Sequence, residues 1–313
     1  MRARLPRVPA SESFHFADEL ILRVRSLGHP LCVGLDPHLA AIPTLFRSGS
    51  MQAAAPATAT AVEQFLLAVV DRLEGRVAII KPQIAFYEQL GAAGMVVLER
   101  VVRRCRDLDL LVLLDAKRGD IGSTADAYAR AYLEPGSPAR ADAITLNAYV
   151  GLDSLEPFVA RARSFGCGMF VLVRTSNPGA GDLQDLATGD APLFARVARS
   201  LSPLAAGLVG KVTGWSSLGA VLGATWPEQA DAVRRELPHS LMLVPGYGAQ
   251  GASAKDAVRS FVRGPAGLEG GIVSSSRGVL FPESGDTDDP RVWERSFDAA
   301  LDQAATELGE AVS

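Results

Sequence analysis

The chain has 313 residues, of which 48% are hydrophobic and 21% are charged, and its formal net charge is −4. This composition is typical of a water-soluble globular protein with a large core. The charge leaves no basic footprint for nucleic acid, although a local arginine and backbone amides can bind phosphate at any net charge.

The three cysteines, Cys32, Cys105 and Cys167, are widely spaced and form no paired motif. This favours a reducing compartment and argues against a disulfide framework or a zinc site. No secretory signal and no run long enough to span a membrane is evident, so we expect a cytoplasmic protein. Length allows one domain or two. We expect a flexible arm over residues 1–11 and one catalytic domain over residues 12–313.

Helical stripes and apolar runs alternate from the start of the chain. An amphipathic helix is expected over 13–26, followed by a strand over 31–37 that ends at Asp36. Residues 48–60 are weakly patterned and indicate a loop. Thr60 and Glu63 have capping-box spacing at the start of a helix over 61–73. A strand over 77–83, a helix over 94–104 and a strand over 110–117 follow.

The same alternation continues to the end of the chain. Ser123 is a candidate cap for a helix over 125–133. The sixth strand is expected over 218–224, with 208–212 as the alternative, and the stretch 207–217 stays unassigned. The remaining expected strands are 143–147, 168–173, 241–244 and 270–274, and the remaining helices are 152–164, 193–201, 227–237, 254–262 and 291–308.

Eight strand–helix units with mostly short connections predict a parallel sheet. Eight such strands favour a single closed (β/α)8 TIM barrel, here with an added N-terminal helix and a C-terminal helix. A doubly wound open sheet is the main alternative. It is weakened because no Gly-x-Gly-x-x-Gly motif follows the first strand.

Residues 110–124 carry the strongest chemical signal. Five apolar residues are followed by Asp115, Lys117 and Asp120, and glycines then break the strand. Asp115 and Lys117 are two residues apart and therefore share a face of the strand. Charges at the end of an apolar strand are unfavourable unless they are paired or used. A structural ion-pair cluster is the simpler explanation, and a catalytic array is the alternative.

Polar residues also follow the other apolar strands, where a barrel has its active site. Lys81 beside Asp115 and Lys117 would form an alternating array that fixes each charge and keeps both lysines protonated. A preorganised ammonium of this kind can deliver a proton to a carbanion without a metal. The four histidines show no metal-like spacing, so no metal is expected. The polar residues at the other strand ends are Asp36, Asn147, Arg174, Gln250 and Arg277.

Two loops late in the chain predict a phosphate site. The glycine-rich turn 245–251 precedes a helix, and Arg277 follows the last strand. Glycines let backbone N–H groups turn toward an anion, and barrels often hold phosphate in the loops after strands seven and eight. An ordinary glycine turn is common, so the arginine carries much of this inference.

Five segments, in the expected order, resemble orotidine 5′-monophosphate decarboxylase, particularly its longer-chain bacterial subgroup. The most specific is Asp-Ala-Lys-Arg-Gly-Asp-Ile-Gly-Ser-Thr over 115–124. The resemblance implies conversion of orotidine 5′-monophosphate to uridine 5′-monophosphate and CO2 in pyrimidine biosynthesis, without a metal or an organic cofactor. The other four segments are 32–37, 81–88, 174–179 and 245–251.

The resemblance also implies roles for the charged residues. Lys117 would protonate C6 of the pyrimidine as the carboxylate leaves. Asp115 and Asp120 would flank this lysine, positioning it and favouring loss of the negative carboxylate. Lys81 and Asp36 would hold the ribose and the charge network.

Phosphate binding and assembly follow from the same resemblance. Gln250 and Arg277 would hold the phosphate. The family enzyme is a homodimer, and Asp120, Ile121 and Thr124 would enter the active site of the partner subunit. Further substrate contacts are expected from Gln83, Asn147 and Ser276.

Two other functions stay open at this point. A metal-assisted sugar-phosphate aldolase or decarboxylase of the same barrel group shares the Asp-x-Lys-x-x-Asp pattern. A catalytically silent phosphate-binding protein is the other alternative. The remaining segments favour the nucleotide decarboxylase over the first, and the intact set of lysines and aspartates argues against the second.

Overall fold

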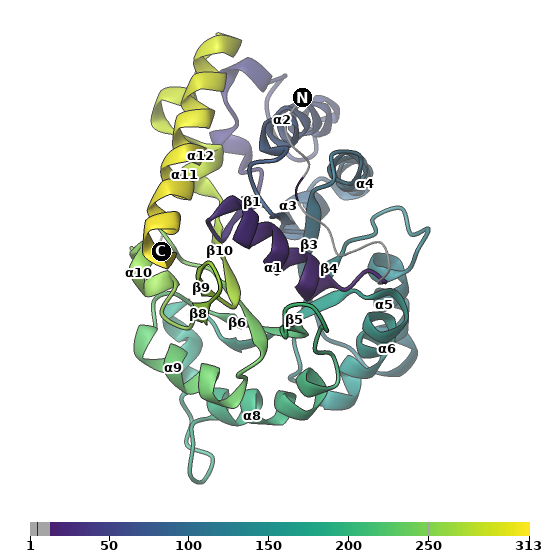
Figure 1. The fold of residues 1–313 in the computed structure, drawn as a ribbon. Coiled ribbons are helices and arrows are strands. Elements are labelled where there is room, and N and C mark those ends of the chain that lie inside the picture. The colour runs from purple at the N-terminus through teal and green to yellow at the C-terminus, as the bar shows by residue number, and fades with distance from the viewer. Residues whose placement is uncertain (1–4, 6–12, 249–250) are drawn as a thin grey trace.

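The computed structural model describes residue 5 and residues 13–248 and 251–313, and its eight parallel strands close into a barrel (Figure 1). The expected closed (β/α)8 barrel is thus confirmed, and the open sheet is excluded. Gln250 and the expected arm, apart from Leu5, lie outside the described residues. In hydrogen-bonding order the barrel strands are β1 (Leu31–Leu35), β10 (Gly271–Ser275), β7 (Ser240–Val244), β6 (Ser216–Leu222), β5 (Gly168–Arg174), β4 (Ala143–Leu146), β3 (Leu111–Arg118) and β2 (Ile79–Pro82).

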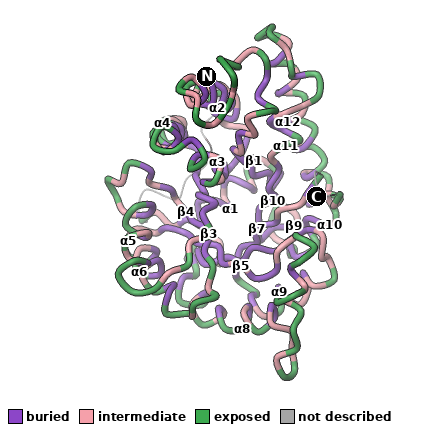
Figure 2. The backbone as a smooth tube through the Cα atoms, turned by 180° about the vertical axis from the view of Figure 1, so that it is seen from behind, coloured by how far each residue is buried: buried purple, intermediate pink, exposed green. Residues whose placement is uncertain are grey.

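Helices surround the barrel, and their buried faces turn toward it (Figure 2). No helix in the described part of the chain is long and apolar enough to cross a membrane. The longer helices are α1 (Phe16–Leu27), α2 (Pro56–Leu73), α4 (Gly91–Asp107), α5 (Gly122–Leu133), α6 (Glu156–Phe165), α8 (Leu193–Ala206), α9 (Pro227–Glu236) and α12 (Pro290–Val312). The four-residue helices are α3 (Ala85–Glu88), α7 (Gly181–Gln184), α10 (Ala254–Ala257) and α11 (Arg277–Leu280).

Helix α1 closes one end of the barrel. Its apolar stripe packs on side chains that point into the barrel, and Phe16 meets Phe170 of β5 edge-on with 6.1 Å between ring centroids. Figure 1 shows α1 lying across the barrel, with strands of both halves around it. Because α1 covers this end, we expect a ligand to enter at the other end of the barrel, where the strands terminate in polar residues.

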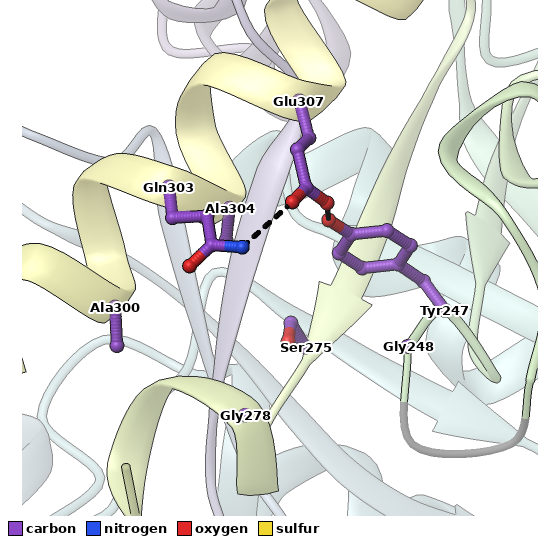
Figure 3. A pocket seen from close by; sticks show the side chains of 8 residues that line it. All are labelled: Tyr247, Gly248, Ser275, Gly278, Ala300, Gln303, Ala304 and Glu307. Carbon is purple, nitrogen blue, oxygen red and sulfur yellow. Dashed lines mark hydrogen bonds between the residues drawn. The ribbon is translucent and has the colours of Figure 1, made fainter. Parts of the chain in front are cut away.

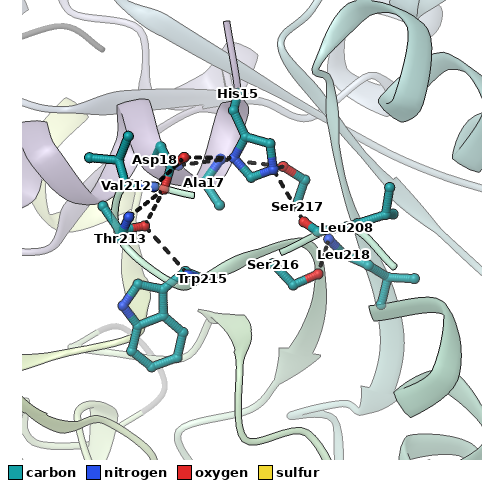
Figure 4. Close-up of polar contacts among 10 residues, drawn as sticks. All are labelled: His15, Ala17, Asp18, Leu208, Val212, Thr213, Trp215, Ser216, Ser217 and Leu218. Carbon is teal, nitrogen blue, oxygen red and sulfur yellow. Dashed lines mark hydrogen bonds and ion pairs between the residues drawn. The ribbon is translucent and has the colours of Figure 1, made fainter. Parts of the chain in front are cut away.

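Residues 207–217, which the sequence left unassigned, hold α1 at the closed end of the barrel. The Asp18 carboxylate of α1 accepts hydrogen bonds from the backbone N–H groups of Val212 and Thr213, at 3.2 and 2.7 Å. His15 lies 3.2 Å from the Ser217 hydroxyl through Nε2 (Figure 4). The sixth strand is β6, so the alternative placement over 208–212 is wrong. The stretch thus links α1 to β6 through hydrogen bonds.

Three local predictions were wrong. Helix α2 begins at Pro56 with Ala55 as its N-cap, so the capping box at Thr60 does not exist. The N-cap of α5 is Ile121, and Ser123 lies inside the helix. The helix expected over 254–262 ends at Ala257, and a hairpin follows, formed by β8 (Val262–Gly264) and β9 (Gly267–Glu269).

Candidate active site

The polar strand ends continue the interior face of the barrel. In β3, Leu111 and Leu113 point into the interior cluster, and Asp115 is the next residue on that face. In β2, Ile79 points inward and Lys81 follows in the same way. The apolar interior therefore ends in a charged layer at the open end, as the sequence predicted.

Asp115 lies between two lysines. Its Oδ2 accepts a hydrogen bond from Lys81 Nζ at 3.0 Å, and its Oδ1 accepts one from Lys117 Nζ at 2.6 Å. The side chains of Lys81 and Asp115 are 7% and 10% exposed, whereas that of Lys117 is 43% exposed. The array thus presents one ammonium to the open end of the barrel and keeps the other inside.

Each buried charge stabilises the others. Burial alone would raise the pKa of the Asp115 carboxyl, but Lys81 and then Lys117 hold that pKa well below its usual range. Burial alone would lower the pKa of Lys81, but Asp115 and then Asp36 raise it above its usual range. Both groups are therefore charged at neutral pH, so their electrostatic field is in place before any substrate binds.

Thr145 of β4 was not predicted as a site residue, yet it contacts the array directly. Its hydroxyl donates to Asp115 Oδ1 at 2.8 Å and accepts from the backbone N–H groups of Ala116 and Lys117, each at 2.9 Å. The signal in the sequence was weak, because a threonine in an apolar strand usually reflects β-propensity alone.

Two polar atoms at the end of β1 and after β10 have no hydrogen-bond partner among the described residues. They are Asp36 Oδ1 and Ser276 Oγ, and both are buried. The Ser276 side chain packs closely on the backbone of β1 at Gly34, where only glycine leaves room, because a Cβ there would lie 2.8 Å from the Ser276 Cβ. Buried polar atoms without partners are costly, and these two atoms have free hydrogen-bonding capacity among the described residues.

The two loops that the sequence predicts to bind phosphate are partly described. Arg277 is exposed at the first position of α11, directly after β10, and pairs with no acidic side chain among the described residues. Tyr247, in the loop after β7, donates a hydrogen bond to Glu307 of α12 at 2.5 Å. Figure 3 shows this contact beside a pocket of about 220 Å³ that Ser275 and Gly278 also line. The glycine turn is therefore fastened to the last helix.

Three predicted residues lie on the exposed loop and first turn after β3. Asp120 accepts a hydrogen bond from the backbone N–H of Ile121 at 2.8 Å and pairs with no cation in the described part of this chain. Ile121 is 58% exposed, and Thr124 is exposed on α5. The predicted partner-facing set is thus accessible, and among the described residues it makes no hydrogen bond or ion pair with the Lys81–Asp115–Lys117 array.

Asn147 and Gln83 follow β4 and β2 as expected, but both have local partners. Asn147 Oδ1 accepts from the backbone N–H of Tyr149 at 3.1 Å, which makes it a turn residue. Gln83 Oε1 accepts from the backbone N–H of Ala85 at 3.3 Å, and its backbone pairs with Asp115. Neither amide nitrogen donates a hydrogen bond among the described residues.

Arg174 does not join the array. Its side chain is fully buried, its guanidinium donates to Asp185 at 3.0 Å and to Gln184 at 3.2 Å, and it stacks over the Trp226 ring at 4.2 Å. These contacts fix the loop after β5, so Arg174 is a structural anchor at its strand end.

Known proteins of similar sequence and structure identify the family of the chain. A family profile described as "Orotidine 5'-phosphate decarboxylase / HUMPS family" matches residues 29–284. The chain belongs to this family. It is similar to the orotidine 5′-phosphate decarboxylase of Rhodopirellula baltica, with 41% identity over 299 residues, which cover 94% of this chain and 98% of the relative.

Two further relatives agree. The orotidine 5′-phosphate decarboxylase of Roseiflexus castenholzii is 40% identical over 90% of this chain and 92% of its own. The structure of Leishmania donovani OMP decarboxylase superposes with a TM-score of 0.72 at 33% identity, over 95% of this chain and 99% of that one. The chain is an orotidine 5′-phosphate decarboxylase of the longer-chain group, a carboxy-lyase of pyrimidine synthesis.

Proposed function

We propose that Lys117 donates the proton that replaces the departing carboxylate at C6 of orotidine 5′-monophosphate. The observation that carries this is the Lys81–Asp115–Lys117 array, in which Lys117 alone presents an exposed ammonium. Asp115 holds this ammonium through Oδ1, and Lys81 holds Asp115 through Oδ2. Loss of CO2 leaves an electron pair at C6, and the adjacent ammonium supplies the proton to that pair.

The substrate is proposed to lie across the open end of the barrel. Asp36 and Lys81, at the ends of the neighbouring strands β1 and β2, are proposed to hold the ribose. Ser276 Oγ, which has no partner among the described residues and lies beside Gly34 of β1, is proposed as a further substrate contact. Arg277 is proposed to hold the phosphate as a charge-assisted pair, together with Gln250, which lies outside the described residues. Asn147 and Gln83 are proposed to contact the pyrimidine edge through their amide nitrogens.

Lys117→Ala separates chemistry from binding. We expect the variant to lose decarboxylation, followed as the ultraviolet change of orotidine 5′-monophosphate, while it still binds uridine 5′-monophosphate by calorimetry. Lys255→Ala, on the short helix α10, is the control for loss of one lysine. The assay includes a chelator, because we propose a reaction that needs no metal or organic cofactor. Full turnover by Lys117→Ala would refute the assigned proton donor, and loss of wild-type turnover in chelator would favour the metal-assisted alternative.

A homodimer with shared active sites is the second part of the proposal. Six of the large exposed apolar side chains lie on the loops after β3, β4 and β5, and such a patch is typical of an interaction surface. Asn147 N–H donates to Arg118 C=O at 2.8 Å, which joins the first two of these loops. The six are Ile121, Tyr149, Val150, Leu152, Leu183 and Leu186.

In this dimer, Asp120, Ile121 and Thr124 of each subunit would reach the partner's Lys117. Mixing Lys117→Ala with Asp120→Ala subunits tests this, because one of the two sites in each hybrid dimer would contain both wild-type residues. Full exchange of equal amounts would restore about a quarter of the sites, counted from the two-fold symmetry. No recovery in dimers verified as hybrids would contradict a shared site. We also propose a cytoplasmic location, as its place in pyrimidine synthesis favours.

A further inference from the structure

We propose that Thr145 is a positioning residue for decarboxylation, whose hydroxyl sets both the backbone of Lys117 and the orientation of the Asp115 carboxylate. This inference rests on the proposed role of Lys117. Thr145 contacts no part of the expected substrate position directly. It acts through three hydrogen bonds to the strand that carries the array.

The hydroxyl of Thr145 is completely used. A hydroxyl has one proton and two acceptor lone pairs. The proton goes to Asp115 Oδ1 at 2.8 Å, and the lone pairs accept the N–H groups of Ala116 and Lys117 at 2.9 Å each. Thr145 is fully buried, so no water replaces these contacts from outside.

These two N–H groups are available because β3 bulges against β4. Leu114 lies opposite Ile144 and Arg118 lies opposite Leu146, so four steps along β3 correspond to two along β4. The extra residues leave the regular ladder, and their N–H groups need another acceptor. Thr145 stands within β4 between the two paired positions and supplies that acceptor.

The bulge also places Lys117 in an unusual backbone conformation. Its φ is +48°, in the left-handed region that residues with a Cβ seldom adopt. Such a conformation persists only where the surroundings hold it, and it often occurs at functional sites. The Thr145 bond to the Lys117 N–H holds it here. The conformation directs the side chain so that Nζ meets Asp115 Oδ1 at 2.6 Å.

Removal of the hydroxyl should therefore displace the proton donor without emptying the site. Thr145→Val keeps the shape of the side chain and removes its three hydrogen bonds, whereas Thr145→Ser keeps the hydroxyl. A displacement of the reacting group by about 1 Å costs on the order of 100-fold in rate. We expect kcat of Thr145→Val to fall by about this factor while KM and the Kd of uridine 5′-monophosphate change less than about threefold.

Two comparisons separate positioning from general stability. Thr58→Val removes another buried hydroxyl, at the start of α2, which donates to the nearby Gln52 C=O at 2.7 Å and makes no contact with the array, so kcat should stay unchanged. Thr145→Ser should keep kcat near the wild-type value. Exchange of the C6 hydrogen of uridine 5′-monophosphate in D2O reports proton transfer alone, and it should slow in Thr145→Val by a factor similar to that in kcat. Should the valine variant not fold, Thr145→Cys, with its weak S–H donor, replaces it in the comparison with serine.

Wild-type kcat in Thr145→Val would overturn the inference, as would an equal loss in the serine and valine variants. Loss of nucleotide binding in parallel with kcat would also overturn it, because the site would then have collapsed. Lys117→Ala distinguishes failure of the inference on Thr145 from failure of the proposed role of Lys117. If Lys117→Ala is inactive and Thr145→Val is fully active, only the inference on Thr145 fails. If Lys117→Ala is active, the proposed role of the lysine fails and the inference fails with it.

Discussion

The substitution Asp115→Asn tests how strongly the charged array depends on its central carboxylate. The change preserves shape but removes the negative charge between Lys81 and Lys117. Lys81 is nearly buried, and removal of one partner from a buried ion pair costs about 3–5 kcal/mol. Lys117 is 43% exposed, so the loss at that end is about 1 kcal/mol or less. We therefore expect a total loss of about 4 kcal/mol in the free energy of unfolding at neutral pH.

Urea denaturation followed by circular dichroism measures this loss. With a slope of about 3 kcal/mol per molar urea, the midpoint should fall by about 1 M. Asp71→Asn is the matched control, because Asp71 forms an exposed ion pair with Arg104 and should change the midpoint little. Equal midpoints for the two variants would refute the reasoning that burial makes the Asp115 pairing strong.

The pH dependence of stability tests the direction of the pKa shift of Asp115. Lys81 and Lys117 lower the folded-state pKa of Asp115, so its contribution to stability is present above its unfolded pKa of about 4. That contribution is lost as the pH falls toward the folded-state pKa. The difference in stability between wild type and Asp115→Asn should therefore be constant from pH 7 to about pH 5 and shrink below about pH 4. A difference that grows below pH 4 would contradict the assigned sign.

Three other predictions follow from the phosphate loops and the barrel interior. Arg277→Ala should raise KM for orotidine 5′-monophosphate by about 10- to 100-fold, as expected for a lost charge-assisted bond, while turnover of phosphate-free orotidine stays unchanged; an equal effect on both substrates would refute phosphate binding. Tyr247→Phe breaks the bond to Glu307 and should raise the same KM by less than Arg277→Ala does, and Glu307→Gln, which can still accept that bond, should raise it least. Gly219→Ala places a Cβ 2.5 Å from both the Leu241 carbonyl and the Phe170 ring, so it should lower the unfolding free energy by about 1–3 kcal/mol, and an unchanged thermal midpoint would contradict this.

The barrel was predictable from the sequence because its strands are short apolar runs separated by helical stripes. Polar residues follow most of these runs, and parallel strands bring such ends together, which predicts that Lys81 and Asp115 meet. The same rule overestimated Arg174. Alternation from Phe170 predicts that it points into the barrel, but a register shift between Leu172 and Arg174 interrupts that alternation, and a bulge leaves little trace in the sequence. Its acceptors Gln184 and Asp185 lie beyond the strand, where no periodic pattern announces them.

Local features were harder to predict where two signals competed. Pro56 at the first helical turn was a better start signal for α2 than the capping-box spacing of Thr60. The hairpin over 262–269 has its own glycine turn, but the apolar residues before it suit a helix equally well. Thr145 was missed because its role depends on the bulge between β3 and β4. A bulge arises from pairing between strands and leaves little trace in either strand alone.

Because α1 covers the end of the barrel and packs on strands that come much later in the sequence, the order of synthesis affects when α1 can be buried. His15 and Ser217 are separated by 202 positions along the chain, and Phe16 rests on Phe170. A chain growing on a ribosome therefore carries α1 for most of synthesis before its resting place exists, with an apolar stripe exposed to the cell. Contacts between such distant residues slow folding. Helix α1, the first helix of the described residues, is therefore expected to be among the last elements to be buried.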